Sequence, residues 1–277
     1  MLEMKYDVET VEYLRETAKR VRRGMIESIG IGVAGHVGGG CSSADILTVL
    51  YFHKMKFDPG NPYDPDRDRF LLSKGHAAVV QYSALALAGV FPKDELLNTK
   101  SIGSMLQGHP DVRKTPGIEA GTGSLGQGLS IGLGMALGLK LDKSDRKVYV
   151  VIGDGEMAEG QIWEAAMAAC VYKADNLVAI LDKNRLQATG FCNDHFDIGD
   201  VRAKWDAFGW HVLEVDGHDI AALLEVFDEA DRVTGKPVMI IAHTIKGKGV
   251  SFAENVASFH NGVLTEGNYA KAIEELS

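Results

Sequence analysis

The chain has 277 residues, 45% of them hydrophobic, and carries a formal net charge of −9 at pH 7. An acidic surface argues against non-specific binding to nucleic acid or to an anionic membrane. The three cysteines are widely spaced and form no CxxC pair. The N-terminal segment reads as charged and helical without the apolar stretch of a signal peptide, and no apolar run reaches 18 residues. We therefore expect a cytoplasmic protein.

The first half of the chain is predicted to be mainly helical. Asp7–Ile29 has the spacing of a long amphipathic helix. Ser43–Met55 is predicted as a second helix, with Ser42 or Ser43 as its N-cap. Gly128–Leu141 is rich in glycine and alanine, which suits a closely packed helix.

From residue 148 onward, short apolar runs alternate with helical patterns. The expected strands are Val148–Ile152, Leu177–Leu181, His211–Val215 and Val238–Ala242. The expected helices between them are Gln161–Tyr172, Val201–Phe208 and Ile220–Val233. Strands without polar alternation are typical of a parallel sheet that is buried on both faces. We expect an α/β fold, with a doubly wound, mainly parallel sheet and helices on both faces.

The sequence contains no linker, repeat or low-complexity tract. We therefore predict a single domain over residues 1–277, in which residues 1–60 form a helical N-terminal part.

Polar residues follow two of the expected strands where each strand ends. Asp154 lies between Gly153 and Gly155, and Asn184 follows the next strand. The carboxyl ends of neighbouring parallel strands meet at one sheet edge, where α/β proteins bind ligands. A carboxylate and an amide oxygen suit magnesium or calcium, and protein-bound magnesium often completes its shell with phosphate oxygens. A helix N-cap at Asp154 and a turn at Asn184 explain each residue singly, but the pair favours a metal and a diphosphate.

A second glycine-rich loop, Gly121–Gly126, matches the GxGxxG pattern of dinucleotide-binding proteins. The pattern is expected to follow a strand, but Pro116 and Gly117 interrupt the preceding segment. A nicotinamide dehydrogenase is therefore disfavoured. The loop remains a candidate for presenting backbone N–H groups to a ligand, or for packing a helix tightly.

The GDG motif, followed about thirty residues later by Asn, resembles the magnesium–diphosphate motif of thiamine-diphosphate enzymes. Other stretches are similar to the first part of transketolase, in order and spacing, from about residue 15 to 264. The stretches are Gly35–Gly39, Leu72–Ala77, Gln107–Pro110, Gly121–Gly128, Gly153–Gly160, Asp182–Leu186, Thr244–Gly249 and Phe259–His260. The resemblance implies the thiamine-diphosphate-binding fold, specifically its diphosphate-binding domain.

The resemblance implies a metal and cofactor site. Asp154 and Asn184 would ligate Mg²⁺, or Ca²⁺ or Mn²⁺ in its place, by their side chains, and Leu186 would ligate it by its carbonyl. Gly155 would offer its backbone N–H to the diphosphate. Other residues would line thiamine diphosphate, namely His76, Gly123, Ser124, Leu125, Lys246 and His260. Glu159 would belong to an interface network that helps activate the cofactor.

The resemblance also implies catalytic histidines. His36 and His109 would face the sugar hydroxyls and assist proton transfer, while His76 and His260 would act beside the cofactor. An imidazole that titrates near neutrality suits this work. The remaining histidines have structural explanations and are His53, His195, His211, His218 and His243. Glu156 is expected to be a solvated or helix N-terminal charge.

The sequence departs from the family pattern in two respects. Val37–Gly40 replaces the Pro and Ser that follow the first histidine in many relatives, which affects part of the substrate pocket. The pyrimidine-binding and C-terminal domains of a complete transketolase have no counterpart here, and no residue can be assigned to the glutamate that activates the cofactor. We expect an N-terminal subunit that works with a separate C-terminal subunit, as an α2β2 assembly, on sugar phosphates.

Three other classes stay open. One is a different thiamine-diphosphate enzyme, such as a deoxyxylulose-phosphate synthase-like enzyme or the E1 component of a 2-oxo acid dehydrogenase. Another is a cofactor-binding subunit without catalysis, against which the intact Asp154, Asn184 and His76 argue. The third, a nicotinamide dehydrogenase, rests only on the Gly121–Gly126 pattern and is disfavoured by its context. The histidine loops in the first 110 residues favour transketolase.

Overall fold

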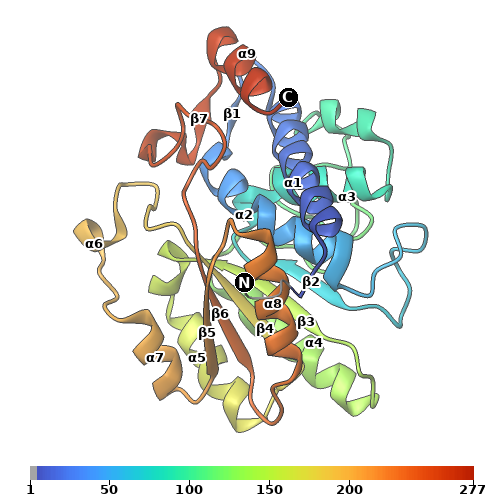
Figure 1. Cartoon of the computed structure of the whole chain (residues 1–277), viewed down its shortest axis with the longest axis vertical. Coiled ribbons are helices and arrows are strands. Elements are labelled where there is room, and N and C mark those ends of the chain that lie inside the picture. Colours follow the sequence, from blue (N-terminus) through green and yellow to red (C-terminus); the bar gives the residue numbers. More distant parts are fainter. Residues whose placement is uncertain (1–4) are drawn as a thin grey trace.

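The computed structural model describes residues 5–277, and within them a five-stranded parallel sheet forms the centre of the molecule (Figure 1). The strands in spatial order are β2 (Arg69–Leu72), β3 (Val148–Gly153), β4 (Leu177–Lys183), β6 (Val238–His243) and β5 (His211–Asp216). Every neighbouring pair in this sheet is parallel. The four predicted strands are confirmed with ends that differ by at most two residues, whereas β2 was not predicted.

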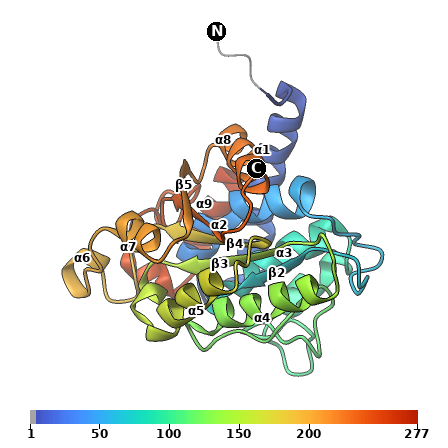
Figure 2. The same cartoon turned by 90° about the horizontal axis from the view of Figure 1, so that it is seen from below.

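Helices cover both faces of the sheet, which confirms the predicted α/β fold class. The helices are α1 (Val8–Ile29), α2 (Val37–Val49), α3 (Ala78–Ala88), α4 (Gln127–Leu141), α5 (Gly160–Val171), α6 (Cys192–His195), α7 (Val201–Ala207), α8 (Ile220–Asp231) and α9 (Glu266–Glu275). Figure 2 shows α4 and α5 along one face, with α1, α2 and α8 on the opposite side. Over residues 5–277, no helix is both long enough and apolar enough to cross a bilayer. The predicted domain begins at Met1, and residues 1–4 lie outside the described residues.

The central strands are apolar throughout because both of their faces are buried. In β3, Tyr149 and Val151 pack into the core beneath α1, α2, α3 and α8. Val148, Val150 and Ile152 of the same strand pack into the core beneath α4, α5 and α7. Alternate side chains of one strand therefore serve two cores, which is why the sequence shows a continuous apolar run.

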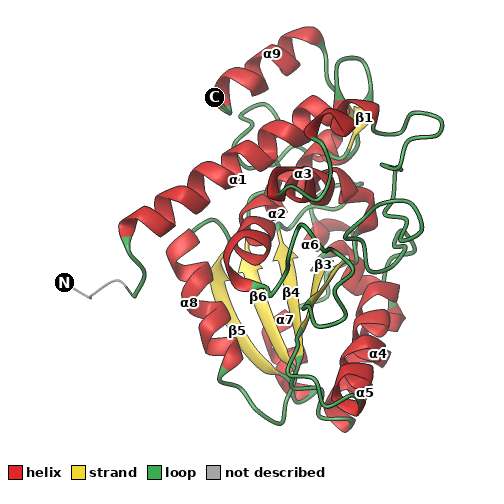
Figure 3. Cartoon of the chain, turned by 90° about the vertical axis from the view of Figure 1, so that its right-hand side faces the viewer, coloured by secondary structure: helices red, strands yellow, loops and turns green. Residues whose placement is uncertain are grey.

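The N-terminal helix α1 has the predicted boundaries and a clear physical start and end. Asp7 is its N-cap and accepts a hydrogen bond from the Thr10 N–H at 2.6 Å. Gly30 ends it with φ = 74°, a positive value that glycine adopts without strain. Figure 3 shows α1 running across the top of the sheet, beside α2 and α3.

The predicted start of α2 was wrong. The helix begins at Val37 after His36, six residues before the predicted start at Ser43, and all of its residues are buried. A Cβ on Gly40 would lie 2.3 Å from Met25 Sδ, so Gly40 allows α2 and α1 to pack closely. Glycine weakens helix propensity, and tertiary packing overrides that weakness here.

A two-stranded antiparallel sheet brings distant parts of the chain together. Strand β1 (Ala34–Gly35) pairs with β7 (Gly262–Val263), with Ala34 opposite Val263. The pairing places the segment before His36 next to the segment after His260 (Figure 1). Residues from the two ends of the sequence thus meet above the main sheet.

Candidate active site

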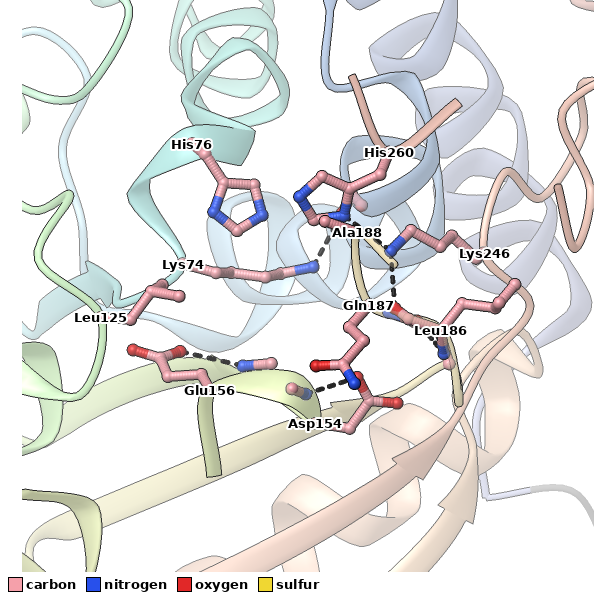
Figure 4. Close-up of a pocket in the computed structure, with 14 residues that line it drawn as sticks. Lys74, His76, Leu125, Asp154, Glu156, Leu186, Gln187, Ala188, Lys246 and His260 are labelled. Carbon is pink, nitrogen blue, oxygen red and sulfur yellow. Dashed lines mark hydrogen bonds between the residues drawn. The ribbon is translucent and has the colours of Figure 1, made fainter. Parts of the chain in front are cut away.

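A cavity of about 190 Å³ lies where β3 and β4 end, and eight predicted site residues line it. The eight are His76, Leu125, Asp154, Gly155, Asn184, Leu186, Lys246 and His260. Figure 4 shows His76 and His260 on one side of the cavity and Asp154 on the other. The fold therefore brings together residues from motifs that are widely separated in the sequence.

Asp154 follows the last residue of β3 and caps the short 3-10 helix Gly155–Ala158. Its Oδ1 accepts a hydrogen bond from the Gly155 N–H at 2.8 Å, and its Oδ2 accepts one from the Arg185 N–H. Burial, together with the negative charge of Asp182, raises the pKa of Asp154 to about 6. The Asp154 carboxylate is thus an N-cap. The positive charge of Lys246 does not offset the effects of burial and of Asp182 on its pKa.

Asn184 and Leu186 lie on the turn that follows β4, beside Asp154. The strand register pairs Gly153 with Asp182, which puts the ends of β3 and β4 side by side. Asn184 Nδ2 donates to Asp182 Oδ2 at 3.1 Å, while Asn184 Oδ1 accepts from the Leu186 N–H at 3.1 Å. The amide orientation therefore directs its nitrogen to a carboxylate and leaves its oxygen as an acceptor on the turn.

These groups fit a hard divalent cation. The set comprises a buried carboxylate with a raised pKa, an amide oxygen and a backbone carbonyl, all of which are oxygen ligands. The Leu186 carbonyl accepts from Lys246 Nζ at 2.6 Å and keeps a second lone pair. Within residues 5–277, no group of three or more His, Cys, Asp or Glu side chains is placed to hold a metal. A metal here would therefore depend on one carboxylate, on the amide and carbonyl oxygens beside it, and on the ligand's own oxygens.

A buried ion pair that sequence reasoning missed supports this edge of the sheet. Asp182 is fully buried and accepts from Lys74 Nζ, from Thr244 Oγ1 and from Ser42 Oγ, the last at 2.7 Å. Lys74 also donates to the Gly39 carbonyl at 2.7 Å. The positive charge of Lys74 lowers the pKa of Asp182 despite its burial. The sequence did hold a signal for the pair, because Lys74 lies in the motif Leu72–Ala77 and Asp182 in the motif Asp182–Leu186.

Glu156 lies in the first turn of the 3-10 helix Gly155–Ala158, as the helix N-terminal alternative predicted, but the alternative of a solvated charge was wrong. Glu156 is 3% exposed, and its Oε1 accepts from Ser73 Oγ and from the Gly126 N–H at 2.8 Å. Its Oε2 accepts from the Gly153 N–H at 3.0 Å. Burial raises its pKa, while these contacts oppose the shift. Glu156 thus joins the glycine-rich loop before α4 to the end of β3.

Three imidazoles meet above the cavity. The ring centroid of His36 lies 4.8 Å from that of His76 and 5.4 Å from that of His260, and the His76 and His260 centroids are 5.0 Å apart. Burial, reinforced by nearby lysines, lowers the pKa of His36 and of His260 to about 4 and that of His76 to about 2. All three rings are therefore neutral at pH 7.

Lys246 connects the three imidazoles to the turn after β4, which carries Asn184 and Leu186. Its Nζ lies 2.9 Å from His260 Nδ1 and donates to the Leu186 carbonyl. Burial, with the positive charge of Lys74, lowers the pKa of Lys246 to about 8. The predicted pair of Lys246 and His260 is thus in direct contact.

The other predicted residues lie around the cavity and do not line it. His109 packs against Gly123, where a Cβ would lie 3.0 Å from His109 Cδ2 and where φ is 148°. Ser124 is exposed in the same loop. Glu159 is the exposed N-cap residue of α5, and its side chain makes no capping hydrogen bond. In the described chain no strand leads directly into Gly121–Gly126, which agrees with the argument against a dinucleotide fold.

Comparison with known proteins supports one family. The family described as transketolase, thiamine diphosphate binding domain, matches residues 14–276. An apulose-4-phosphate transketolase subunit of Phocaeicola vulgatus is 44% identical over 267 residues, which cover 96% of this chain and 95% of that protein. The 6-deoxy-6-sulfo-D-fructose transketolase subunit SqwG of Clostridium sp. (strain MSTE9) is 46% identical over 263 residues, which cover 95% and 96%.

Longer relatives match over part of their length. Human transketolase is 41% identical over 273 residues, which cover 98% of this chain and 43% of that enzyme. The structure of transketolase from Leishmania mexicana superimposes with a TM-score of 0.89 at 31% identity, covering 95% of this chain and 41% of that one. This chain therefore spans less than half the length of these relatives, and it nearly equals the length of the two bacterial subunits.

The resemblance predicted from the sequence is thus confirmed by a family match and by close relatives along nearly the whole chain. The chain belongs to the transketolase family and comprises the thiamine diphosphate-binding domain of that family.

Proposed function

We propose that the chain is the thiamine diphosphate-binding subunit of a two-subunit transketolase, which transfers a two-carbon ketol unit between sugar phosphates. The observation that carries the proposal is the cluster of Asp154, Asn184 and the Leu186 carbonyl beside the Gly155 N–H, at the carboxyl edge of a parallel sheet. The names of the relatives that match end to end, both called transketolase subunits, support it.

In this proposal, Asp154, Asn184 and the Leu186 carbonyl would hold Mg²⁺, and the Gly155 N–H would face the diphosphate. Lys246, His76, Leu125, Gly123 and Ser124 contact the remainder of the cofactor. Bound thiamine diphosphate supplies the electron sink for breaking a carbon–carbon bond next to a carbonyl.

The chain's own residues would handle the sugar. His36, His76 and His260 are neutral at pH 7, so each ring has an unprotonated nitrogen that can accept a hydrogen bond from a sugar hydroxyl. Their lowered pKa values make these buried rings weaker proton acceptors than a free imidazole. His109 lies at the edge of the glycine-rich loop and would contribute from that side. Lys246 stays close to His260 and would disfavour an additional positive charge there.

A separate C-terminal subunit would complete the active site by supplying the glutamate that activates the cofactor. The names of the two bacterial relatives, both of which are called subunits, support such a partner. An α2β2 assembly is the simplest closed arrangement, and exposed Glu159 at the start of α5 would lie at the interface. Residues 1–277 would act as one domain in the cytoplasm, where the unpaired Cys41, Cys170 and Cys192 remain reduced.

The substrate proposal is a ketose with a charged terminal group. One relative is named for apulose-4-phosphate and the other for 6-deoxy-6-sulfo-D-fructose. We favour sugar phosphates, and a panel of phosphorylated and sulfonated ketoses assayed with the complete enzyme tests this choice. Turnover of sulfonated ketoses alone would contradict it.

The site itself is tested by two alanine variants. Asp154→Ala and Asn184→Ala should each abolish Mg²⁺-dependent binding of thiamine diphosphate in titration calorimetry, because each removes a ligand. Asp206→Ala on the exposed face of α7 is the matched control and should bind as the parent does. Unchanged cofactor affinity in either site variant would refute the metal assignment.

A further inference from the structure

A buried chain of polar contacts runs from α1 to the loop that carries Lys246. Arg22 on α1 donates to both carboxylate oxygens of Asp45 on α2, with Nη1 3.0 Å from Oδ1. Arg22 also donates from Nε to the Cys41 carbonyl at 3.2 Å. Arg22 and Asp45 are 6% and 5% exposed, so this pair is fixed inside the helical layer.

His218, on the turn after β5, extends this chain toward the cavity. Its Nδ1 lies 2.7 Å from Asp45 Oδ2, and its Nε2 lies 2.8 Å from the backbone nitrogen of Ile245. A backbone N–H can only donate, so Nε2 must be the unprotonated acceptor. Nδ1 therefore carries the proton and donates a hydrogen bond to Asp45. The contacts with Asp45 and with Ile245 together fix the tautomer of the His218 ring.

The Ile245 amide adjoins Lys246, a residue that lines the candidate site. Lys246 follows Ile245 directly, donates to the Leu186 carbonyl at 2.6 Å and lies 2.9 Å from His260 Nδ1. The loop after β6, residues 244–256, forms turns and no helix or strand, and it has hydrogen bonds of its own. The Lys248 N–H donates to the Ile245 carbonyl at 3.1 Å, and the Asn255 N–H donates to the Lys246 carbonyl at 2.8 Å. Besides the contact with His218, a hydrogen bond from the Gly247 N–H to the Gly38 carbonyl at 2.9 Å ties this loop to α2.

We propose that His218 is a positioning residue for Lys246: Asp45 orients its ring, and its Nε2 holds the Ile245 amide so that the Lys246 ammonium reaches the Leu186 carbonyl. Asp45 is already neutralised by Arg22, so the carboxylate does not need His218 for charge balance. The contact that His218 alone supplies is the one to the Ile245 N–H. The proposal rests on the proposed role of Lys246 as a cofactor contact.

Two substitutions separate the two contacts of the ring. His218→Asn places a short amide near the position of Nδ1, so it keeps a donor for Asp45 and loses the acceptor for Ile245. His218→Gln reaches the position of Nε2 and can still accept from the Ile245 N–H. His243→Gln is the matched control, because His243 Nε2 makes an exposed 2.7 Å contact with Glu214.

The first readouts need no cofactor. In the full chain labelled with ¹⁵N-histidine, long-range ¹⁵N–¹H spectra should show His218 protonated on Nδ1 alone. Hydrogen exchange of the Ile245 amide should be faster in His218→Asn than in the parent, and close to the parent in His218→Gln and His243→Gln. A proton on Nε2 in the parent, or equal exchange in all four proteins, would overturn the proposal.

The second readout is cofactor binding by the full chain with Mg²⁺. His218→Asn should raise the Kd of thiamine diphosphate about tenfold or more, the range seen when an outer contact of a site is removed. His218→Gln should recover most of this loss, which a purely structural role would not predict. Tight binding by His218→Asn with fast Ile245 exchange would show that the loop does not position Lys246. If the parent itself binds no cofactor, the proposed function fails, while the tautomer and the exchange data still decide whether His218 holds the loop.

Discussion

Glu156 illustrates how a single carboxylate can organise a site around it. It accepts from Ser73 and from the N–H groups of Gly126 and Gly153, and so ties three backbone segments together. Each contact satisfies a donor that water cannot reach. The same GDGE stretch therefore contains a proposed metal ligand at Asp154 and a structural hub two residues later.

Glu156→Ala should destabilise the chain by about 3 kcal/mol, because it leaves several buried donors without acceptors. Urea denaturation of the full chain measures the change in the free energy of unfolding. Glu164→Ala, on the exposed side of α5, should change it by less than about 0.5 kcal/mol. Equal stabilities of the two variants would contradict the role assigned to Glu156.

The histidine cluster predicts a pH dependence of stability. Folding lowers the pKa of His36 and of His260 from 6.5 to about 4. Between these values the unfolded chain takes up protons that the folded chain does not, so stability should fall as pH falls from about 6.5 to about 4. His36→Gln should lose less stability than the parent across this window.

Thermal unfolding of the cofactor-free chain at pH 7 and pH 5 tests this dependence. His53→Gln is the control, since His53 is exposed on the segment after α2 and stands apart from the cluster. It should follow the parent. Identical falls in Tm for the parent and for His36→Gln would show that burial of His36 does not couple its protonation to folding.

At the scale of elements, the sequence predicted those parts whose signals are local. The strands β3 and β4 are continuous apolar runs because each is buried on both faces, and their ends identified Asp154 and Asn184. Strand β2 was missed because Arg69–Leu72 is a short edge strand, and only its parallel pairing with β3 reveals it.

Contacts between residues far apart in the sequence determine the features that local sequence patterns did not predict. The start of α2 was misplaced because Gly38–Gly40 weaken helix propensity, while the fold needs glycine at position 40 for α2 to approach α1. Glu156 was misjudged because the donors that surround it come from Ser73 and Gly126, distant in sequence. The pair of Lys74 and Asp182 is 108 positions apart and could be found only in three dimensions.

The packing of α4 on the sheet offers a matched test within one helix. A Cβ on Gly132 would lie 2.5 Å from Val150 Cγ2, whereas a Cβ on Gly134 would meet nothing within 4 Å. Gly132→Ala should therefore destabilise the chain by about 1–3 kcal/mol through overpacking. Gly134→Ala should stabilise it by up to about 1 kcal/mol, because alanine favours a helix.

Chemical denaturation of the two variants alongside the parent gives both values. Opposite signs are expected, although the chemical change is the same. If Gly132→Ala were as stable as Gly134→Ala, α4 would not pack on β3 as closely as the structure shows.

At the scale of the whole molecule, the proposed site depends on elements from both layers. The sheet edge provides Asp154 and Asn184, the helical layer provides His36 and His76, and the segment before β7 brings His260 to them. The residues of one cavity thus extend over most of the chain. Glu156 lines this cavity, but its carboxylate is held by Ser73, Gly126 and Gly153. The proposal therefore places the activating glutamate on a second subunit.

The most direct test of this account is a ketol-transfer assay of the chain alone, of the proposed C-terminal subunit alone, and of the two together. Each sample contains thiamine diphosphate, Mg²⁺, a ketose phosphate donor and an aldose phosphate acceptor. The account predicts turnover by the mixture only, and no turnover by a mixture that contains Asp154→Ala. Turnover by the chain alone would contradict it.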